Sequence, residues 1–139
     1  MSWLISLTGH LLKARRSAES KTPMTNRTVT ISSDSDRQKL FASLVPRLID
    51  YIYAQGYSCT FGDAYRSPQV KYGHENSLHR HRLAIDLNLF DQKGKYLTDS
   101  ESHRPFGEYW QSLNPECTWG GEEDGNHYSM FASHYNMKF

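Results

Sequence analysis

The sequence predicts a small α+β domain, because two helical patterns and several strand patterns share one short chain. Apolar residues recur with helical spacing between Asp34 and Gly56, and again over residues 104–113. Between and after these segments, apolar and polar residues alternate as they do in half-buried strands. The chain has 139 residues, which is enough for one hydrophobic core and one active site.

The first helical segment begins near Asp34, where Ser33 or Asp34 can cap it, and Gly56 can end it. Pro46 lies inside the pattern and should kink or break the helix, because a proline there costs roughly 3 kcal/mol through a lost donor and a steric clash. The apolar residues lie at i, i+4 and i+1, i+5: Leu40, Phe41, Leu44, Val45, Leu48, Ile49, Ile52 and Tyr53.

Four segments are expected to form strands. Tyr57–Gly62 alternates in the manner of a half-buried strand, and Leu83–Phe90 followed by Lys95–Leu97 has the pattern of a hairpin. The last expected strand is His127–Phe131. The second helix carries four apolar residues at helical spacing: Phe106, Tyr109, Trp110 and Leu113.

Residues 1–30 are predicted to be an amphipathic extension and linker, and residues 31–139 the folded domain. The apolar residues of the first 16 positions fall on one helical face and precede a basic cluster, so the segment could act on membranes. The interpretation that we favour is a frayed extension, or residues upstream of a functional start at Met24, because short isolated helices are marginal in water. The order of apolar and basic residues is not that of a secretory signal, and no apolar run is long enough for a transmembrane helix.

Charge and cysteine content argue against several classes of function. The formal net charge is +1, which gives no general attraction to nucleic acid or anionic membranes. We therefore expect no nucleic-acid partner. Cys59 and Cys117 lie far apart without a CxxC spacing, so we expect both to be reduced, buried, structural thiols.

A zinc site could be built from His79, Asp86 and His127. Catalytic zinc usually takes three protein ligands, commonly two histidines and a carboxylate, and leaves one position for water. Asp124 stands three residues before His127, a spacing that lets a carboxylate reach water at this site and act as a general base.

Other residues could compete for these roles. Seven histidines in one short chain make chance pairs with aspartate common, and His81 lies only two residues after His79. Glu122 or Glu123 could replace Asp124 as the catalytic carboxylate. We interpret the remaining histidines as bystanders, together with His81: His10, His74, His103 and His134.

The segment Ser77–Leu78–His79, followed by Ala84–Ile85–Asp86, resembles the SxHxxGxAxD signature of the LAS-type peptidases. This family contains D-Ala-D-Ala carboxypeptidases and L-alanyl-D-glutamate endopeptidases. The resemblance extends over roughly residues 34–135 and includes the Trp119–Gly120–Gly121 turn. One departure is Arg82, which stands at the signature glycine and puts the shape of this loop in doubt.

The resemblance implies a role for each site residue. His79, Asp86 and His127 would bind Zn²⁺ in an open groove on a small antiparallel sheet with packed helices. Asp124 would activate water and later protonate the leaving amine. Arg66 would contact substrate or the developing oxyanion, unless it is only a surface partner of Asp63 or Glu75. Ser77 would hydrogen-bond the loop or a ligand, or serve as a plain turn residue.

The resemblance also implies a biological role. Short members without a signal peptide look like phage or prophage endolysins, so we expect an L-alanyl-D-glutamate endopeptidase that acts on peptidoglycan stem peptides as a monomer. Such a protein would stay in the host cytoplasm until holin-mediated release to the cell wall. Two alternatives are a D-Ala-D-Ala carboxypeptidase or dipeptidase, and a non-catalytic wall-binding protein that keeps the zinc.

Overall fold

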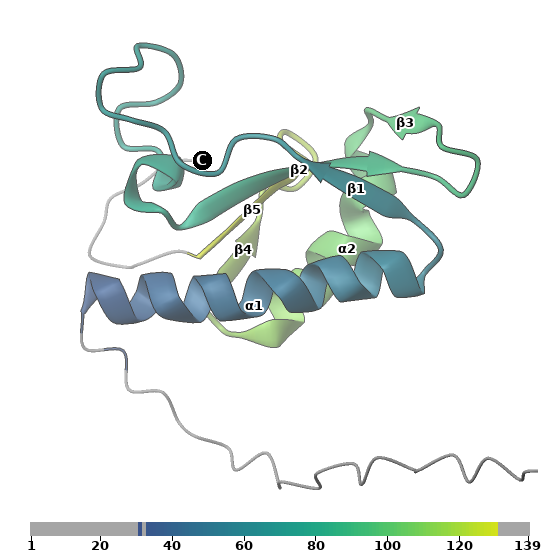
Figure 1. Cartoon of the computed structure of the whole chain (residues 1–139), viewed down its shortest axis with the longest axis horizontal. Helices are drawn as coiled ribbons and strands as arrows, with labels where there is room; N and C mark the ends of the chain where they lie inside the picture. The colour runs from purple at the N-terminus through teal and green to yellow at the C-terminus, as the bar shows by residue number, and fades with distance from the viewer. Residues whose placement is uncertain (1–30, 32, 131–139) are drawn as a thin grey trace, which may run out of the picture. The chain divides into compact units, whose positions relative to one another are not determined.

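The structure is a computed structural model that describes residue 31 and residues 33–130. The predicted N-terminal extension, residues 1–30, lies outside these residues, as does Phe131. The described part is α+β, as the sequence predicts, with two α-helices and one antiparallel sheet of five strands (Figure 1). In chain order the elements are α1 (Asp34–Ala54), β1 (Ser58–Phe61), the 3₁₀-helix η1 (Leu78–His81), β2 (Ala84–Phe90), β3 (Tyr96–Leu97), α2 (Ser100–Leu113), β4 (Cys117–Trp119) and β5 (His127–Met130).

Helix α1 has the ends that the sequence predicts. The Ser33 side chain accepts a hydrogen bond from the Asp36 amide and caps the first turn. Gly56, at φ +83°, ends the segment. The predicted break at Pro46 is wrong, because the helix is continuous through it. Pro46 and Ala42 lie on the exposed side, where solvent can satisfy the carbonyl group that loses its intrahelical partner.

The sheet has the order β1-β2-β5-β4, and β3 pairs with β2 as the predicted hairpin requires. Strand β4 has only three residues and was not among the expected strands. Helix α2 begins at Ser100, four residues before the expected start, because the Asp99 carboxylate accepts a hydrogen bond from the Ser102 amide and caps it there.

The core lies between the helices and one face of the sheet. Trp110 of α2 is fully buried and meets Phe41 of α1 edge-to-face, with ring centroids 5.7 Å apart. On β2 the core-facing residues are Ile85, Leu87 and Leu89. Asp86 and Asn88 alternate with them and therefore point to the opposite face.

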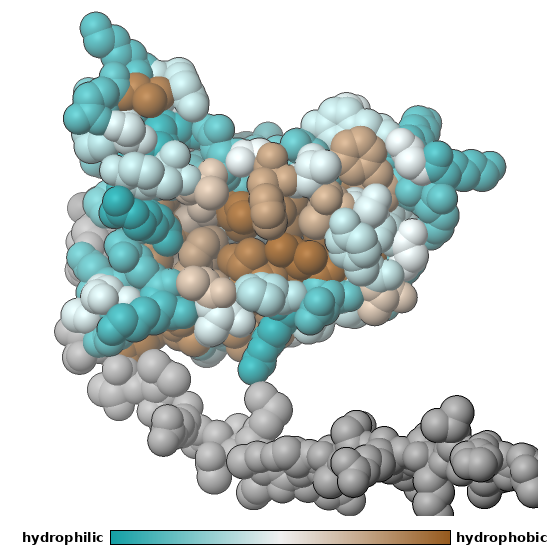
Figure 2. Space-filling model, in the orientation of Figure 1, coloured by the Kyte–Doolittle hydropathy of each residue, from teal (hydrophilic) through white to brown (hydrophobic). Residues whose placement is uncertain are grey.

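Part of the apolar layer reaches the surface. Figure 2 shows apolar residues in the band between α1 and the sheet, with hydrophilic residues on either side of it. Neither helix of the described part combines the length and the apolar character needed to cross a bilayer.

Both cysteines are free thiols, as predicted. Cys117 is buried, and its burial raises the pKa of the thiol to about 12. Cys59 is only partly buried, so the predicted burial holds for one of the two residues.

The substitution Gly107→Ala is expected to destabilise the fold by about 2–3 kcal/mol. Gly107 is buried in α2, and a methyl group there would overlap the Trp119 indole. Glu108→Ala, on the exposed side of the same helix, is a matched control that should change stability by less than about 0.5 kcal/mol. Urea unfolding of both variants measures the difference, and equal midpoints would contradict the predicted close packing.

Candidate metal centre

The register of two strands brings Asp86 and His127 together. β2 and β5 are antiparallel, with Ile85 opposite Tyr128 and Asp86 opposite His127. Tyr128 is fully buried in the core. Asp86 and His127 are the next pair along the two strands, so they project from the other face of the sheet. A slip of one residue would reverse these faces and place the carboxylate in the apolar core.

The 3₁₀-helix η1 supplies the third side chain. Ser77 caps this short helix, and its Oγ accepts a hydrogen bond from the His79 amide. His79 is 3% exposed and projects toward Asp86 at the start of β2. The spacing of His79 and Asp86 predicts a loop at this point, and the structure has one turn of 3₁₀-helix there.

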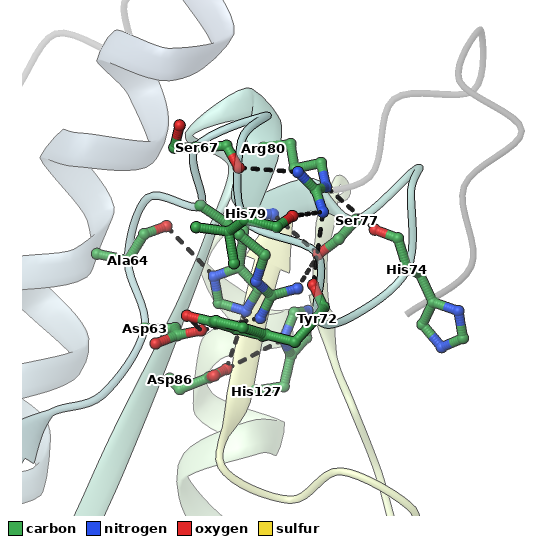
Figure 3. A network of polar contacts seen from close by, with 12 residues as sticks. Asp63, Ala64, Ser67, Tyr72, His74, Ser77, His79, Arg80, Asp86 and His127 are labelled. Carbon is green, nitrogen blue, oxygen red and sulfur yellow. Dashed lines mark hydrogen bonds and ion pairs between the residues drawn. The ribbon is translucent and has the colours of Figure 1, made fainter.

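His79, Asp86 and His127 form one compact group that could bind a metal ion. Their potential ligand atoms all lie within 4.8 Å of one another. Asp86 Oδ1 is 3.2 Å from His79 Nε2 and 3.2 Å from His127 Nδ1 (Figure 3). Two ligands of a tetrahedral ion, at ordinary zinc–ligand distances, would be about 3.4 Å apart. The spacing of these three side chains therefore fits a metal site.

The hydrogen bonds of His79 also fit a ligand role. Its Nδ1 lies 3.2 Å from the Ala64 carbonyl oxygen, which can only accept, so Nδ1 carries a proton. In the neutral ring Nε2 is then an acceptor that faces a carboxylate oxygen. Two acceptors at this distance require a cation between them, either a proton or a metal ion. Backbone carbonyls commonly orient metal-binding histidines in this way.

The charges of the three groups depend on one another. Burial raises the pKa of Asp86, but hydrogen bonds from His127 and His79 outweigh it and lower the pKa to about 2. Burial lowers the pKa of His79, but the hydrogen bond and charge of Asp86 raise it above the ordinary value. The carboxylate is thus ionised at neutral pH, as metal binding requires.

Asp124 is the carboxylate nearest to the group among the three candidates from the sequence. Its Oδ2 is 3.8 Å from His127 Nδ1, and its side chain is 49% exposed. The His127 amide donates to the Asp124 carbonyl oxygen, which closes the turn between them. Gly120 lets this turn close tightly, because a methyl group there would overlap the Asp124 backbone.

No family model matches this chain, and no curated protein sequence matches it.

Within the described part of the chain, the competing residues are not members of the metal group. Glu122 is 82% exposed and pairs with Arg104 at 3.1 Å. Glu123 is exposed. His81 is not one of the three residues that the structure groups around a metal-sized space.

Arg66 and Ser77 meet beside the metal group. One Arg66 nitrogen donates to Asp63 Oδ2 at 2.9 Å, and another donates to Ser77 Oγ at 3.2 Å. The Arg66 backbone amide donates to the His79 carbonyl oxygen. The ion pair with Asp63, which is the structural alternative to a functional role for Arg66, thus belongs to the same network as the contact with Ser77.

Arg82 stands where the signature has glycine, and it adopts a left-handed backbone conformation that glycine takes more easily than other residues. Its φ is +58°, in the left-handed region, where a residue with a side chain is strained by roughly 1–2 kcal/mol. The Arg82 guanidinium lies 4.1 Å from the centre of the Tyr65 ring, a contact that partly offsets the strain. The loop thus turns at Arg82 without the glycine.

Sequence reasoning did not identify Arg80 as a structural residue of this site. Its guanidinium donates to carbonyl oxygens of the loop that follows Arg66, and Figure 3 shows several of these bonds. Backbone carbonyls leave no mark in a sequence, so only the position of Arg80 next to His79 could have drawn attention to it. The carbonyl groups that it contacts belong to Ser67, Val70, Tyr72 and His74.

His103 lies outside the metal group and is expected to make folding depend on pH. Burial lowers the pKa of His103 to about 4, against a small opposing effect of Asp99. Between that value and the ordinary 6.5, the unfolded chain binds the proton more readily, so stability falls as pH falls. Protonation of His103 alone should lower the free energy of unfolding by about 2 kcal/mol between pH 7 and pH 5.

Urea unfolding of the wild type and of His103→Gln at both pH values measures this effect. The variant cannot titrate at this position, so its loss of stability between pH 7 and pH 5 should be smaller by about that amount. Equal losses in the two proteins would show that His103 does not contribute.

Proposed function

We propose that this protein is a zinc peptidase that cuts peptidoglycan stem peptides, most specifically the bond between L-alanine and D-glutamate or its amidated form. The observation that carries the proposal is the group formed by His79, Asp86 and His127, with Asp124 3.8 Å from His127. Two imidazoles and one carboxylate are a donor set that zinc takes in catalytic sites. The spacing of Ser77, His79 and Asp86, which resembles the LAS-type signature, supports the same assignment.

The side chains of the site divide the chemistry between them. When bound by His79, Asp86 and His127, zinc would polarise the scissile carbonyl and increase the acidity of water. Asp124 takes a proton from the attacking water and returns it to the leaving amine nitrogen. Its side chain is 49% exposed, so water and substrate have access to the carboxylate.

We assign to Arg66 the stabilisation of the negative charge that develops on the substrate during the reaction. Its side chain is only 11% exposed and is fixed by Asp63 and Ser77. A fixed guanidinium stabilises a developing oxyanion better than a mobile one, because little reorganisation is needed during the reaction. Ser77 serves as a positioning residue, since it contacts both Arg66 and the His79 amide.

The biological role that we propose is that of a phage or prophage endolysin. The protein would act as a monomer, remain in the host cytoplasm until a holin admits it to the wall, and lyse the cell by cutting stem peptides.

Release of amino groups from purified sacculi tests whether the protein cleaves the wall. Zinc-loaded protein should release new amino ends steadily, and protein treated with a chelator should release none until zinc is restored. Binding to sacculi without any release would favour the non-catalytic alternative. A D-Ala-D-Ala carboxypeptidase would instead release free D-alanine.

A further inference from the structure

The loop that follows Arg66, residues 67–74, is held in place by the Arg80 side chain. The loop forms neither helix nor strand. A guanidinium group can serve several acceptors at once, because its N–H groups point outward in one plane. Arg80 therefore acts toward the 67–74 loop as an internal cation that gathers carbonyl oxygens around one positive charge. The four carbonyl groups that accept from it are those of Ser67 at 2.9 Å, Val70 at 2.9 Å, His74 at 3.3 Å and Tyr72 at 3.4 Å.

The 67–74 loop in turn contacts the Arg66 guanidinium. Arg66 Cζ lies 5.0 Å from the centre of the Tyr72 ring. The Tyr72 hydroxyl donates to Asp63 Oδ2 at 3.4 Å, and the same oxygen accepts from Arg66 at 2.9 Å. Figure 3 shows the Tyr72 side chain extending toward Asp63. Gly73 packs against the same guanidinium, because a methyl group at this position would overlap Arg66 Nη1.

The Arg66 guanidinium is thus fixed from two sides. Asp63 and Ser77 accept from its two terminal nitrogens, and Tyr72 and Gly73 enclose it. Its Nε is buried, and within the described part of the chain no acceptor lies within hydrogen-bonding distance of this atom. A buried donor without an acceptor is unfavourable, so the surrounding contacts must hold the guanidinium in this position.

We propose that the 67–74 loop positions Arg66 for the reaction and that Arg80 keeps the loop in place. The inference rests on the proposed function, in which Arg66 stabilises the negative charge that develops on the substrate. A cation that is already in place does this better than one that must reorient. Arg80 and Gly73 are then positioning residues, which act through Arg66 and need no contact with the substrate.

Exchange of the Arg66 Nε–H proton with water tests the packing of the loop without a peptidase assay. The signal is observed in ¹⁵N-labelled full-length protein and is identified by its loss in Arg66→Lys. Exchange should be slow in the wild type, because Nε is buried. Gly73→Ala should make it faster by about tenfold or more, since the methyl group displaces the guanidinium.

Gly94→Ala is the matched control for Gly73→Ala. Both glycines have a φ of +78°, so both substitutions bring the same backbone strain. A methyl group at Gly94 meets no atom within 4 Å, so this variant should exchange the Arg66 proton as slowly as the wild type. Equal exchange in the wild type and Gly73→Ala would overturn the inference.

Arg80→Lys tests the role of the internal cation. The variant keeps the positive charge, but one ammonium group cannot reach all four carbonyl oxygens. Exchange of the Arg66 proton should become about as fast as in Gly73→Ala. Arg47→Lys, on the exposed side of α1, should exchange as the wild type does. Exchange at the wild-type rate in Arg80→Lys would exclude Arg80 as the residue that keeps the loop in place.

Steady-state kinetics on a muropeptide test the consequence for the reaction. Zinc-loaded Gly73→Ala should lose about 10–10²-fold in kcat, with KM and zinc content close to those of the wild type, because the lost interaction belongs to the transition state. Gly94→Ala should keep its kcat. An unchanged kcat in Gly73→Ala, despite faster exchange, would overturn the positioning role. If the wild type cleaves no muropeptide while exchange still separates Gly73→Ala from Gly94→Ala, the proposed function fails and the contact of the loop with Arg66 stands.

Discussion

Asp124→Asn is expected to lower kcat on a stem peptide by about 10²–10⁴-fold, because an amide cannot accept a proton from water or return one to the leaving amine. Asp124 lies 3.8 Å from His127 and is half exposed, so the substitution should leave the fold intact. The measurement is the steady-state rate of the zinc-loaded variant on a purified muropeptide.

Two controls show whether the loss arises from proton transfer. Zinc stoichiometry of Asp124→Asn should equal that of the wild type, because His79, Asp86 and His127 are unchanged. Glu122→Gln should keep nearly full activity, since this exposed carboxylate pairs with Arg104. A loss of less than about threefold in the rate of Asp124→Asn would be far smaller than the usual contribution of a general base. Such a result would rule out this role for Asp124.

Zinc is expected to raise the thermal stability of the wild type substantially. A ligand at 1,000 times its dissociation constant stabilises the folded state by about 4 kcal/mol, which corresponds to a rise in Tm of roughly 15 °C or more for a domain of this size. Asp86→Asn and His79→Ala should lose most of this rise, because each removes one of the three ligands. Differential scanning calorimetry with and without zinc measures the change.

His74→Ala provides the matched control for His79→Ala. His74 is exposed and its side chain lies outside the group of three ligands, so this variant should respond to zinc as the wild type does. The same rise in Tm for His79→Ala and the wild type would exclude His79 as a ligand. Acidic buffer should weaken the effect of zinc, because protons compete for the histidine nitrogens.

Local signals in the sequence were enough to predict most of the fold. The Ser33 cap and Gly56 mark the ends of α1, and the alternation of β2 separates its core face from the face that carries Asp86. Strand β4 was missed because three residues are too few to show a period. Pro46 did not break α1, since its solvent-facing position makes the lost hydrogen bond easier to tolerate.

The metal group could be predicted as a set of residues but not as a geometry. Asp86 and His127 are 41 positions apart in sequence, and their contact depends on the register of β2 and β5, which the local pattern does not specify. The spacing of Asp124 and His127 did predict their proximity, because the two residues share one turn.

The supporting contacts were the least predictable part of the site. Arg80 holds its loop through backbone carbonyls, which have no sequence signature. His103 was interpreted as a bystander, and it does lie outside the metal group. Its pairing with Tyr128 requires the packing of α2 on β5, which no local pattern shows.

Mass spectrometry of a single defined muropeptide, incubated with zinc-loaded protein, tests the central claim most directly. We predict two products separated between L-alanine and D-glutamate, formed only when both zinc and Asp124 are present. Release of D-alanine would move the assignment to a carboxypeptidase, and an intact muropeptide in the presence of fully zinc-loaded protein would contradict the peptidase assignment.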